Sequence, residues 1–223
     1  TSPANVNAVI GKEIIRSFIS GKPGIPTRGV GALPEALAKR LSNIELGRNI
    51  NSLNELTGPV IVATDVTTAA QLLDMTSVPK LAASTTWYHE IPTQLTSSKC
   101  LVIDGQKRGP VVNSIAISNL APSYAPAGKT LLSSTTVEFA SESEVRRHLA
   151  LIWGAQSSEW SLIAKYEIPK SLPIFAPGAQ HVTSAKVSKN IYVAGDYRSA
   201  PSQNGALLSG RLAAEELLFD QRS

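Results

Sequence analysis

The stretch that decides the fold is Ile191-Tyr192-Val193-Ala194-Gly195-Asp196, followed after a short loop by Ser202-Gln203-Asn204-Gly205-Ala206-Leu207-Leu208-Ser209-Gly210-Arg211. Four apolar or small residues lead into a Gly-Asp turn, and an amphipathic run follows the polar loop, so the pattern predicts a strand, a loop and a helix. The glycine leaves room for another molecule, the aspartate can hydrogen-bond a sugar hydroxyl, and the unpaired N–H groups of a helix start attract anions. Two interpretations follow: a phosphate-binding connection, or an ordinary strand–helix connection whose aspartate caps a backbone group.

A second strand–helix pair lies nearer the start of the chain. Residues 59–63 form a continuous apolar run, which is typical of a strand buried on both faces, and a helix is expected over residues 66–73. Strand–helix pairs at both ends of the chain favour a parallel α/β sheet. Apolar spacing and β-forming residues also predict helices over residues 6–19 and 32–41 and short strands over residues 44–46 and 49–53.

The middle of the chain is rich in β-forming residues separated by turn residues, which favours an antiparallel sheet. Its strands are expected over residues 83–89, 99–103, 111–118, 130–137 and 160–168. Ser141 and Glu144 have the spacing of a capping box and open a helix that we expect to pack on this sheet. The prolines at positions 169, 173 and 177 predict an irregular segment after the last strand.

These patterns predict a mixed α/β (α+β) fold in two parts. One domain, with a parallel sheet, is expected from residues 1–80 and 174–223, and a β-rich domain from residues 81–173 is inserted into it.

Composition excludes several classes of protein. The net charge of +4 over 223 residues comes from charges spread along the chain, without a basic patch, so nucleic acid is not an expected partner. Cys100 is the single cysteine, which excludes an intrachain disulfide and a multi-cysteine metal site, and we expect it to be a buried small hydrophobe. No apolar run approaches the ~20 residues that span a bilayer, and no signal sequence is seen, so a cytoplasmic location is expected.

Side chains typical of catalysis are missing. His89, His148 and His181 are widely separated and in no metal-binding spacing, so no metal site is expected. A Gly-x-Ser-x-Gly elbow is absent, which argues against a serine hydrolase. Gly29-x-Gly31-x-x-Pro34 lacks a preceding strand and the third glycine of a dinucleotide fingerprint, which disfavours an NAD(P)-binding enzyme.

Six blocks of sequence carry a family resemblance: residues 16–26, 29–34, 59–64, 121–128, 168–173, and 193–196 with 204–211. In this order they resemble the flavin-containing amine oxidase and phytoene-desaturase-like superfamily of FAD-dependent oxidoreductases, collinearly along nearly the whole chain. The last block is the most specific, since it is similar to the C-terminal FAD motif of that superfamily.

The resemblance implies FAD as the cofactor and hydride transfer from a small-molecule substrate: an amine, a polyene or a porphyrinogen. It implies that Asp196, after Gly195, hydrogen-bonds the ribityl chain, and that Ile50 contacts adenine through its backbone on a second strand. Backbone N–H groups near the flavin ring and pyrophosphate are implied at Gln203, Asn204, Gly205 and Ala206. The β-rich middle would be the substrate domain.

The chain departs from the superfamily at its start. The N-terminal Gly-x-Gly-x-x-Gly unit of a Rossmann-like FAD domain is absent, and the sequence begins at Thr1 within an expected helix. We therefore expect the C-terminal part of a longer oxidoreductase, which alone is inactive and holds FAD weakly or not at all, with a missing N-terminal segment as a partner. The competing hypothesis is a non-catalytic remnant, or a binding or dimerisation module, that keeps the fold without the cofactor.

Overall fold

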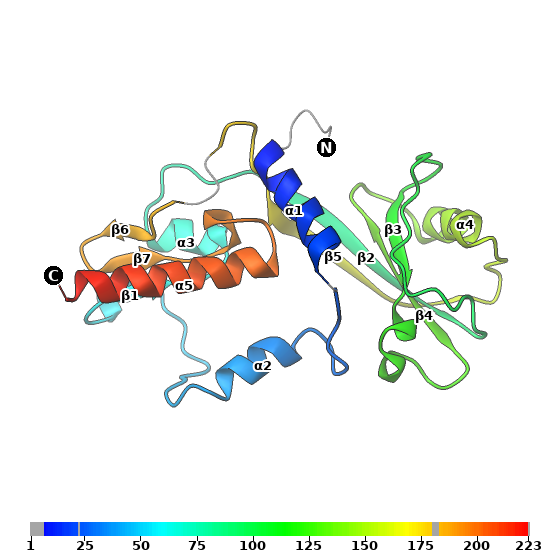
Figure 1. Ribbon diagram of the computed structural model, residues 1–223, viewed down its shortest axis with the longest axis horizontal. Coiled ribbons are helices and arrows are strands. Elements are labelled where there is room, and N and C mark those ends of the chain that lie inside the picture. The colour runs from blue at the N-terminus through cyan, green and yellow to red at the C-terminus, as the bar shows by residue number, and fades with distance from the viewer. Residues whose placement is uncertain (1–6, 22, 180–182, 223) are drawn as a thin grey trace. The chain divides into compact units, whose positions relative to one another are not determined.

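The computed structural model describes residues 7–21, 23–179 and 183–222, and its helices and strands form a mixed α/β protein (Figure 1). The chain divides into two compact units. The first, which we call the α/β unit, comprises Thr1–Gly21, Glu45–Ala82 and Leu172–Ser223. The second, the antiparallel unit, comprises Lys22–Ile44 and Ala83–Ser171.

Residues 22–44 belong to a different unit from the one expected. From the sequence they were expected in the same domain as the parallel sheet. They contain helix α2, Ala32–Ala38, and group with the antiparallel unit. Two side chains of that unit hold its first turn: Ser123 Oγ donates to the Thr27 carbonyl and the Tyr124 hydroxyl donates to the Pro26 carbonyl, each over 2.6 Å. These hydrogen bonds are the physical reason for the difference.

A three-stranded sheet in the order β1-β7-β6 is the centre of the α/β unit. Strand β1, Val60–Val62, pairs in parallel with β7, Ile191–Val193, and β6, Lys186–Ser188, pairs antiparallel to β7. The two strands predicted from the apolar runs are thus confirmed, and the pairing between them is the expected parallel one.

Two helices cover the opposite faces of this sheet. Val62 and Val193 pack in one cluster with helix α3, Val66–Leu72, whereas Tyr192 packs in another with helix α5, Gln203–Asp220. Side chains alternate between the faces of a strand, so an uninterrupted apolar run is what burial on both faces requires. Figure 1 shows α5 running along the sheet.

The far end of α5 is fastened to the sheet by a shared carboxylate. Asp220 Oδ2 accepts a hydrogen bond from the Tyr192 hydroxyl over 2.6 Å and lies 2.6 Å from Lys186 Nζ. The hydrogen bond to Asp220 raises the pKa of Tyr192 to about 12. Strands β6 and β7 and the last turn of α5 are therefore held at one point.

Helix α1, Ala8–Ser20, is confirmed where the apolar spacing predicted a helix. Its cap is Asn7, whose Oδ1 accepts from the backbone N–H groups of Val9 and Ile10 and whose Nδ2 donates to the Ala179 carbonyl over 2.8 Å. Asn7 and Ile10 are buried, whereas most of the later side chains of the helix are exposed. Helix α1 is therefore anchored at its first turn.

The strands predicted over residues 44–46 and 49–53 are wrong. Leu53–Glu55 forms a short 3-10 helix instead, and the residues before it have no strand pairing. Glu55 Oε1 accepts from the backbone N–H groups of Asn51 and Ser52, and Ser52 Oγ accepts from that of Asn54. Local side-chain acceptors thus take the donors that a strand ladder would need.

The antiparallel unit is built on a four-stranded sheet in the order β3-β4-β2-β5. Its strands are β2 Leu81–Ile91, β3 Val111–Ala116, β4 Thr130–Thr136 and β5 Ser161–Pro173. Strand β4 is antiparallel to both β2 and β3, as predicted, whereas the strand expected over residues 99–103 is only a single bridge between Val102 and Ser114.

Helix α4, Glu142–Trp153, covers one face of this sheet and begins at the predicted capping box of Ser141 and Glu144. Its buried Val145 and Leu149 join the core of the unit. The other core side chains are Trp87, Ile91, Val111, Ala116, Leu132, Ala140 and Trp160.

Strand β5 is longer than predicted. It continues through Pro169 to Pro173, where an irregular segment was expected. The sheet order puts β5 at an edge, and an edge strand tolerates proline because its outward N–H groups have no ladder partner.

A buried histidine fastens the turn before β3. His148 Nδ1 accepts from the Val111 backbone N–H over 3.1 Å, so Nε2 carries the proton that it shares with Asp104 Oδ2 at 2.8 Å. The hydrogen bond from the Arg108 backbone N–H, together with those from His148 and Gln106 and the Arg108 charge, lowers the pKa of Asp104 to about 2. Both ring nitrogens of His148 are committed to structure.

We predict that Asp104→Asn weakens the antiparallel unit and removes part of its acid sensitivity. Because the folded pKa of about 2 lies below the ordinary value of 3.8, the stabilisation by Asp104 is fully present above about pH 4 and is lost as the pH falls through about 2. Thermal unfolding followed by circular dichroism between pH 7 and pH 2 should show a lower Tm for the variant at pH 7, and a smaller difference from the wild type at pH 2. Glu138→Gln, an exposed carboxylate in the same unit, is the control. A constant difference at all pH values would contradict the role given to Asp104.

Candidate functional site

The Gly-Asp turn follows β7 directly. Gly195 has an extended backbone, with φ 164° and ψ 163°, and a Cβ placed on it would lie 2.2 Å from the Tyr197 ring. Its N–H donates to Ser209 Oγ over 2.8 Å, which ties the end of the strand to the second turn of α5. Packing within the chain therefore already requires a glycine at this position.

Asp196 begins a short 3-10 helix, Asp196–Arg198, and its side chain is half-buried. Burial raises the pKa of its carboxyl, partly offset by hydrogen bonds from the backbone N–H groups of Tyr197 and of Asp196 itself. A half-buried carboxylate that is held by backbone donors keeps a fixed direction and retains acceptor capacity for a ligand hydroxyl.

The start of α5 is closely packed against the preceding loop. Ser202 is the N-cap: its Oγ accepts from the Gly205 N–H over 3.0 Å, and its carbonyl accepts from the Ala206 N–H over 2.9 Å. A Cβ on Gly205 would lie 1.9 Å from the Ala200 carbonyl oxygen. In the described part of the chain, the N–H groups of Gln203 and Asn204 have no hydrogen-bond partner.

A pocket of about 600 Å³ lies at this helix start, within the α/β unit. Of the residues implied by the resemblance it contains Asn204 and Gly205 but not Gly195, Asp196, Gln203 or Ala206. The residues that line it are Glu13, Ile14, Ser17, Phe18, Leu172, Ser199, Ala200, Pro201, Ser202, Asn204, Gly205 and Leu208. The contribution of α1 was missed in the sequence, although the apolar spacing that predicted this helix is the signal that points to it.

Ile50 is half-buried in the loop before the 3-10 helix Leu53–Glu55, outside this pocket. The second strand on which it was expected is absent, since residues 49–52 form no ladder.

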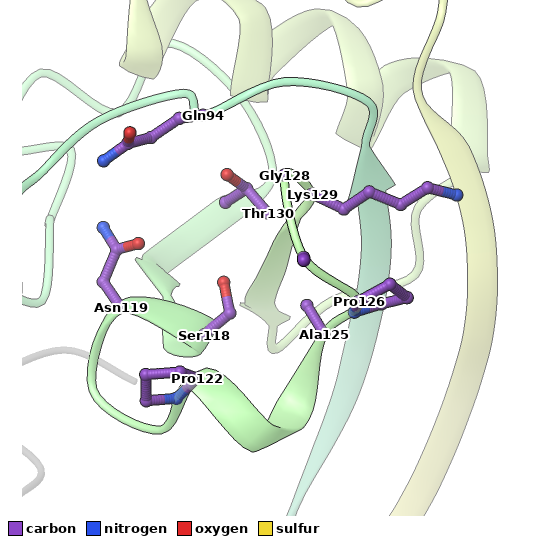
Figure 2. Close-up of a pocket in the computed structure, with 10 residues that line it drawn as sticks. Gln94, Ser118, Asn119, Pro122, Ala125, Pro126, Gly128, Lys129 and Thr130 are labelled. Atoms are coloured by element: carbon purple, nitrogen blue, oxygen red, sulfur yellow. The ribbon is translucent and has the colours of Figure 1, made fainter.

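A smaller cavity of about 340 Å³ lies in the antiparallel unit, and three of the polar side chains that line it already make hydrogen bonds within the chain (Figure 2). Ser118 Oγ accepts from the Leu131 N–H, Asn119 Nδ2 donates to the Thr96 carbonyl, and Thr130 Oγ1 donates to the Thr93 carbonyl. Figure 2 shows Lys129 directed away from the cavity, where it pairs with Glu90. This cavity is therefore a weaker candidate than the pocket at α5.

Few other side chains among the described residues are arranged for metal binding or catalysis. No three His, Cys, Asp or Glu side chains there gather to hold a metal ion, and no helix in those ranges is both long and apolar enough to cross a membrane. His89 and His148 are buried against separate carboxylates, and His181 lies outside the described residues. Cys100 is exposed, so the expectation that it is buried was wrong; it lies in a loop, where its N–H bonds to Ser98 Oγ.

Residues 50–218, more than half of the chain, match the family described as flavin containing amine oxidoreductase. The chain belongs to this family. The resemblance that the six sequence blocks indicated is thereby confirmed, and the C-terminal block with its Gly-Asp turn lies inside the matched range.

Solved structures support the mixed α/β fold of this chain. A protein from Exiguobacterium sp. 255-15, provisionally named a protoporphyrinogen oxidase, is 16% identical with a TM-score of 0.65 over 87% of this chain and 52% of its own. An oxidoreductase from Methanosarcina mazei is 14% identical with a TM-score of 0.51, over 70% of this chain and 42% of its own. A reduced UDP-galactopyranose mutase is 16% identical with a TM-score of 0.50, over 63% and 34%. A comparison with curated proteins gave no match.

The chain spans about half the length of the first of these proteins. At such low identities the comparisons confirm the fold class, a mixed α/β architecture.

Replacing each of two glycines of α5 by alanine should change the stability of the protein in opposite directions. Gly205→Ala should destabilise the protein by about 1–3 kcal/mol, because the new methyl group collides with the Ala200 carbonyl. Gly210→Ala should stabilise it by about 0.5–1 kcal/mol, since nothing lies within 4 Å of the added Cβ and alanine favours the helix. Urea unfolding of both variants measures the difference, and shifts of the same sign would show that the loop does not pack on the helix start as described.

Proposed function

We propose that this chain is the C-terminal part of an FAD-dependent oxidoreductase that removes a hydride from a small-molecule substrate. The observation that carries the proposal is the match of residues 50–218 to a flavin-containing family. When bound, FAD supplies the hydride acceptor, so a protein of this kind needs no catalytic triad of its own.

The residues at the start of α5 fit such a cofactor. The N–H groups of Gln203 and Asn204 are available donors at a helix N-terminus, whereas those of Gly205 and Ala206 are bound by Ser202. In our proposal Gln203 and Asn204 bind the negatively charged edge of the cofactor, and Gly205 lets the loop pack closely enough to fix their position. Asp196 accepts hydrogen bonds from the ribityl hydroxyls, and the backbone of Ile50 contacts adenine.

In this proposal, a Gly-x-Gly-x-x-Gly segment outside this chain provides the remaining contacts to the cofactor. The chain spans 52% of the Exiguobacterium protein, which leaves room in that fold for such a segment. In this proposal the antiparallel unit is the substrate-binding domain. An amine, a polyene or a porphyrinogen each fits the family, and the neighbour provisionally named a protoporphyrinogen oxidase supports the last of these.

We predict that Asp196→Ala weakens FAD binding by roughly tenfold or more, because a hydrogen bond to a charged group contributes about 1.5–3 kcal/mol and each 1.4 kcal/mol is a factor of ten. The experiment titrates the chain with FAD, follows flavin absorption and fluorescence, and is repeated on the complete oxidoreductase. Glu215→Ala, an exposed carboxylate on the same α5, is the control and should bind FAD as the wild type does.

Equal flavin content in the Asp196→Ala and Glu215→Ala proteins would contradict the role of Asp196. A complete protein that retains no flavin at high FAD concentration would favour the competing hypothesis, a binding module that keeps the fold without the cofactor.

A further inference from the structure

Strand β5 presents a long open edge. It runs over 13 residues at the end of the order β3-β4-β2-β5, and no strand in the described part of the chain pairs with its outer side. Native sheets usually keep such edges short, because unpaired N–H and C=O groups bind other strands. Three large apolar side chains along it are exposed: Ile163 by 56%, Tyr166 by 57% and Ile168 by 42%. The edge can therefore accept a further strand.

Pro169 indicates which backbone groups of β5 face outward. A proline has no N–H to give to a ladder, so its nitrogen lies on the open side of an edge strand. The backbone groups of alternate residues point the same way, which puts the N–H and C=O groups of Lys165 and Glu167 on the open side as well. These two residues can exchange backbone hydrogen bonds with a strand that docks there.

The two faces of β5 differ in chemistry. Lys165 lies on the face covered by α4, because its Nζ is 4.8 Å from the centre of the buried Trp87 ring, and it pairs with Glu167 Oε1 at 2.5 Å. Tyr166 points to the other face, where its ring meets that of Tyr88 edge-on with 6.0 Å between the centroids. The charges and the aromatic ring are thus on opposite faces of the strand.

The order of charges along β5 is self-complementary. When a second copy of β5 is placed antiparallel about a two-fold axis through Tyr166, Lys165 of each copy lies opposite Glu167 of the other. Opposite charges directly across an antiparallel pair are favourable, whereas like charges are not. A lysine on an edge usually opposes pairing, but in this register it meets a carboxylate. The same register brings the two Tyr166 rings together on the other face.

A groove of about 280 Å³ beside β5 adds an apolar contact in the same register. Its lining includes Pro169 and Phe139, and Phe139 is 93% exposed. The register that matches the charges puts Ile163 of the second copy opposite Pro169, at the rim of this groove. Exposed apolar side chains from both copies therefore come together at each end of the paired strands, where they leave water.

We propose that the open edge of β5 is a homodimer interface, at which two copies of this chain pair antiparallel about Tyr166 and join their four-stranded sheets into one. The partner is a second copy because the order of Lys165 and Glu167 matches its own reverse. The assembly goes beyond the flavin function, since none of these residues is assigned to the cofactor.

The test measures the molar mass of the whole chain by analytical ultracentrifugation, from low micromolar to several hundred micromolar concentration. The wild type should dimerise. Lys165→Glu and Glu167→Lys should each weaken the dimer by about tenfold or more, because both attractive pairs across the axis become repulsive. Lys99→Glu, the same change of charge on an exposed loop residue of the same unit, should leave dimerisation unchanged.

Mixing the two variants guards against a loss of folding. An equimolar mixture of Lys165→Glu and Glu167→Lys chains should form a heterodimer about as tightly as the wild type, because every charged pair across the axis is then attractive. A variant that fails to fold gives no such rescue.

A disulfide tests the register. In a Cys100→Ser background, Tyr166→Cys should form a disulfide-linked dimer in air, because the two copies of position 166 face each other with about 4.5 Å between their Cα atoms. Ala164→Cys in the same background should not, since position 164 lies opposite Ile168 of the second copy.

Three outcomes would overturn the inference: a monomer at every concentration, a dimer that survives both charge reversals, or equal cross-linking through positions 164 and 166.

Discussion

The hydrogen bond from the Gly195 N–H to Ser209 Oγ sets the geometry on which the candidate site depends. It joins the end of β7 to the second turn of α5, so the loop between them must turn back over the helix start. That path brings the Ala200 carbonyl against Gly205 and lets Ser202 cap the helix. The two N–H groups left without a partner in the described structure, those of Gln203 and Asn204, are positioned as a consequence of this packing.

Two glycines of the C-terminal motif, Gly195 and Gly205, are required by packing within the chain itself. The Tyr197 ring excludes a side chain at position 195 and the Ala200 carbonyl excludes one at position 205. A motif that is read as leaving room for a cofactor therefore also encodes the close packing of its own loop. The two requirements agree, because a loop that packs tightly on a helix start keeps backbone donors in one place for a ligand.

Prediction from sequence succeeded where local pattern and burial agree. The continuous apolar runs gave β1 and β7 because both of their faces are covered by helices, and the capping box gave the start of α4 because its hydrogen bonds are local. It failed before the 3-10 helix, because the nearby Glu55 side chain takes the donors that the expected strand would need. It also failed at β5, because the edge position of this strand in the sheet lets it run through Pro169. The contribution of α1 to the pocket was missed because apolar spacing predicts the helix but does not say which distant segments lie beside it.

The carboxylate of Asp220 fixes the C-terminal end of α5 to the sheet. With Ser202 and Gly205 holding its first turn and Tyr192 and Lys186 holding its last, this helix of 18 residues is clamped at both ends. A helix of that length is about 27 Å long and stiff. It therefore links strands β6 and β7 at one end of the sheet to the loop that positions the Gln203 and Asn204 N–H groups at the other end of the helix.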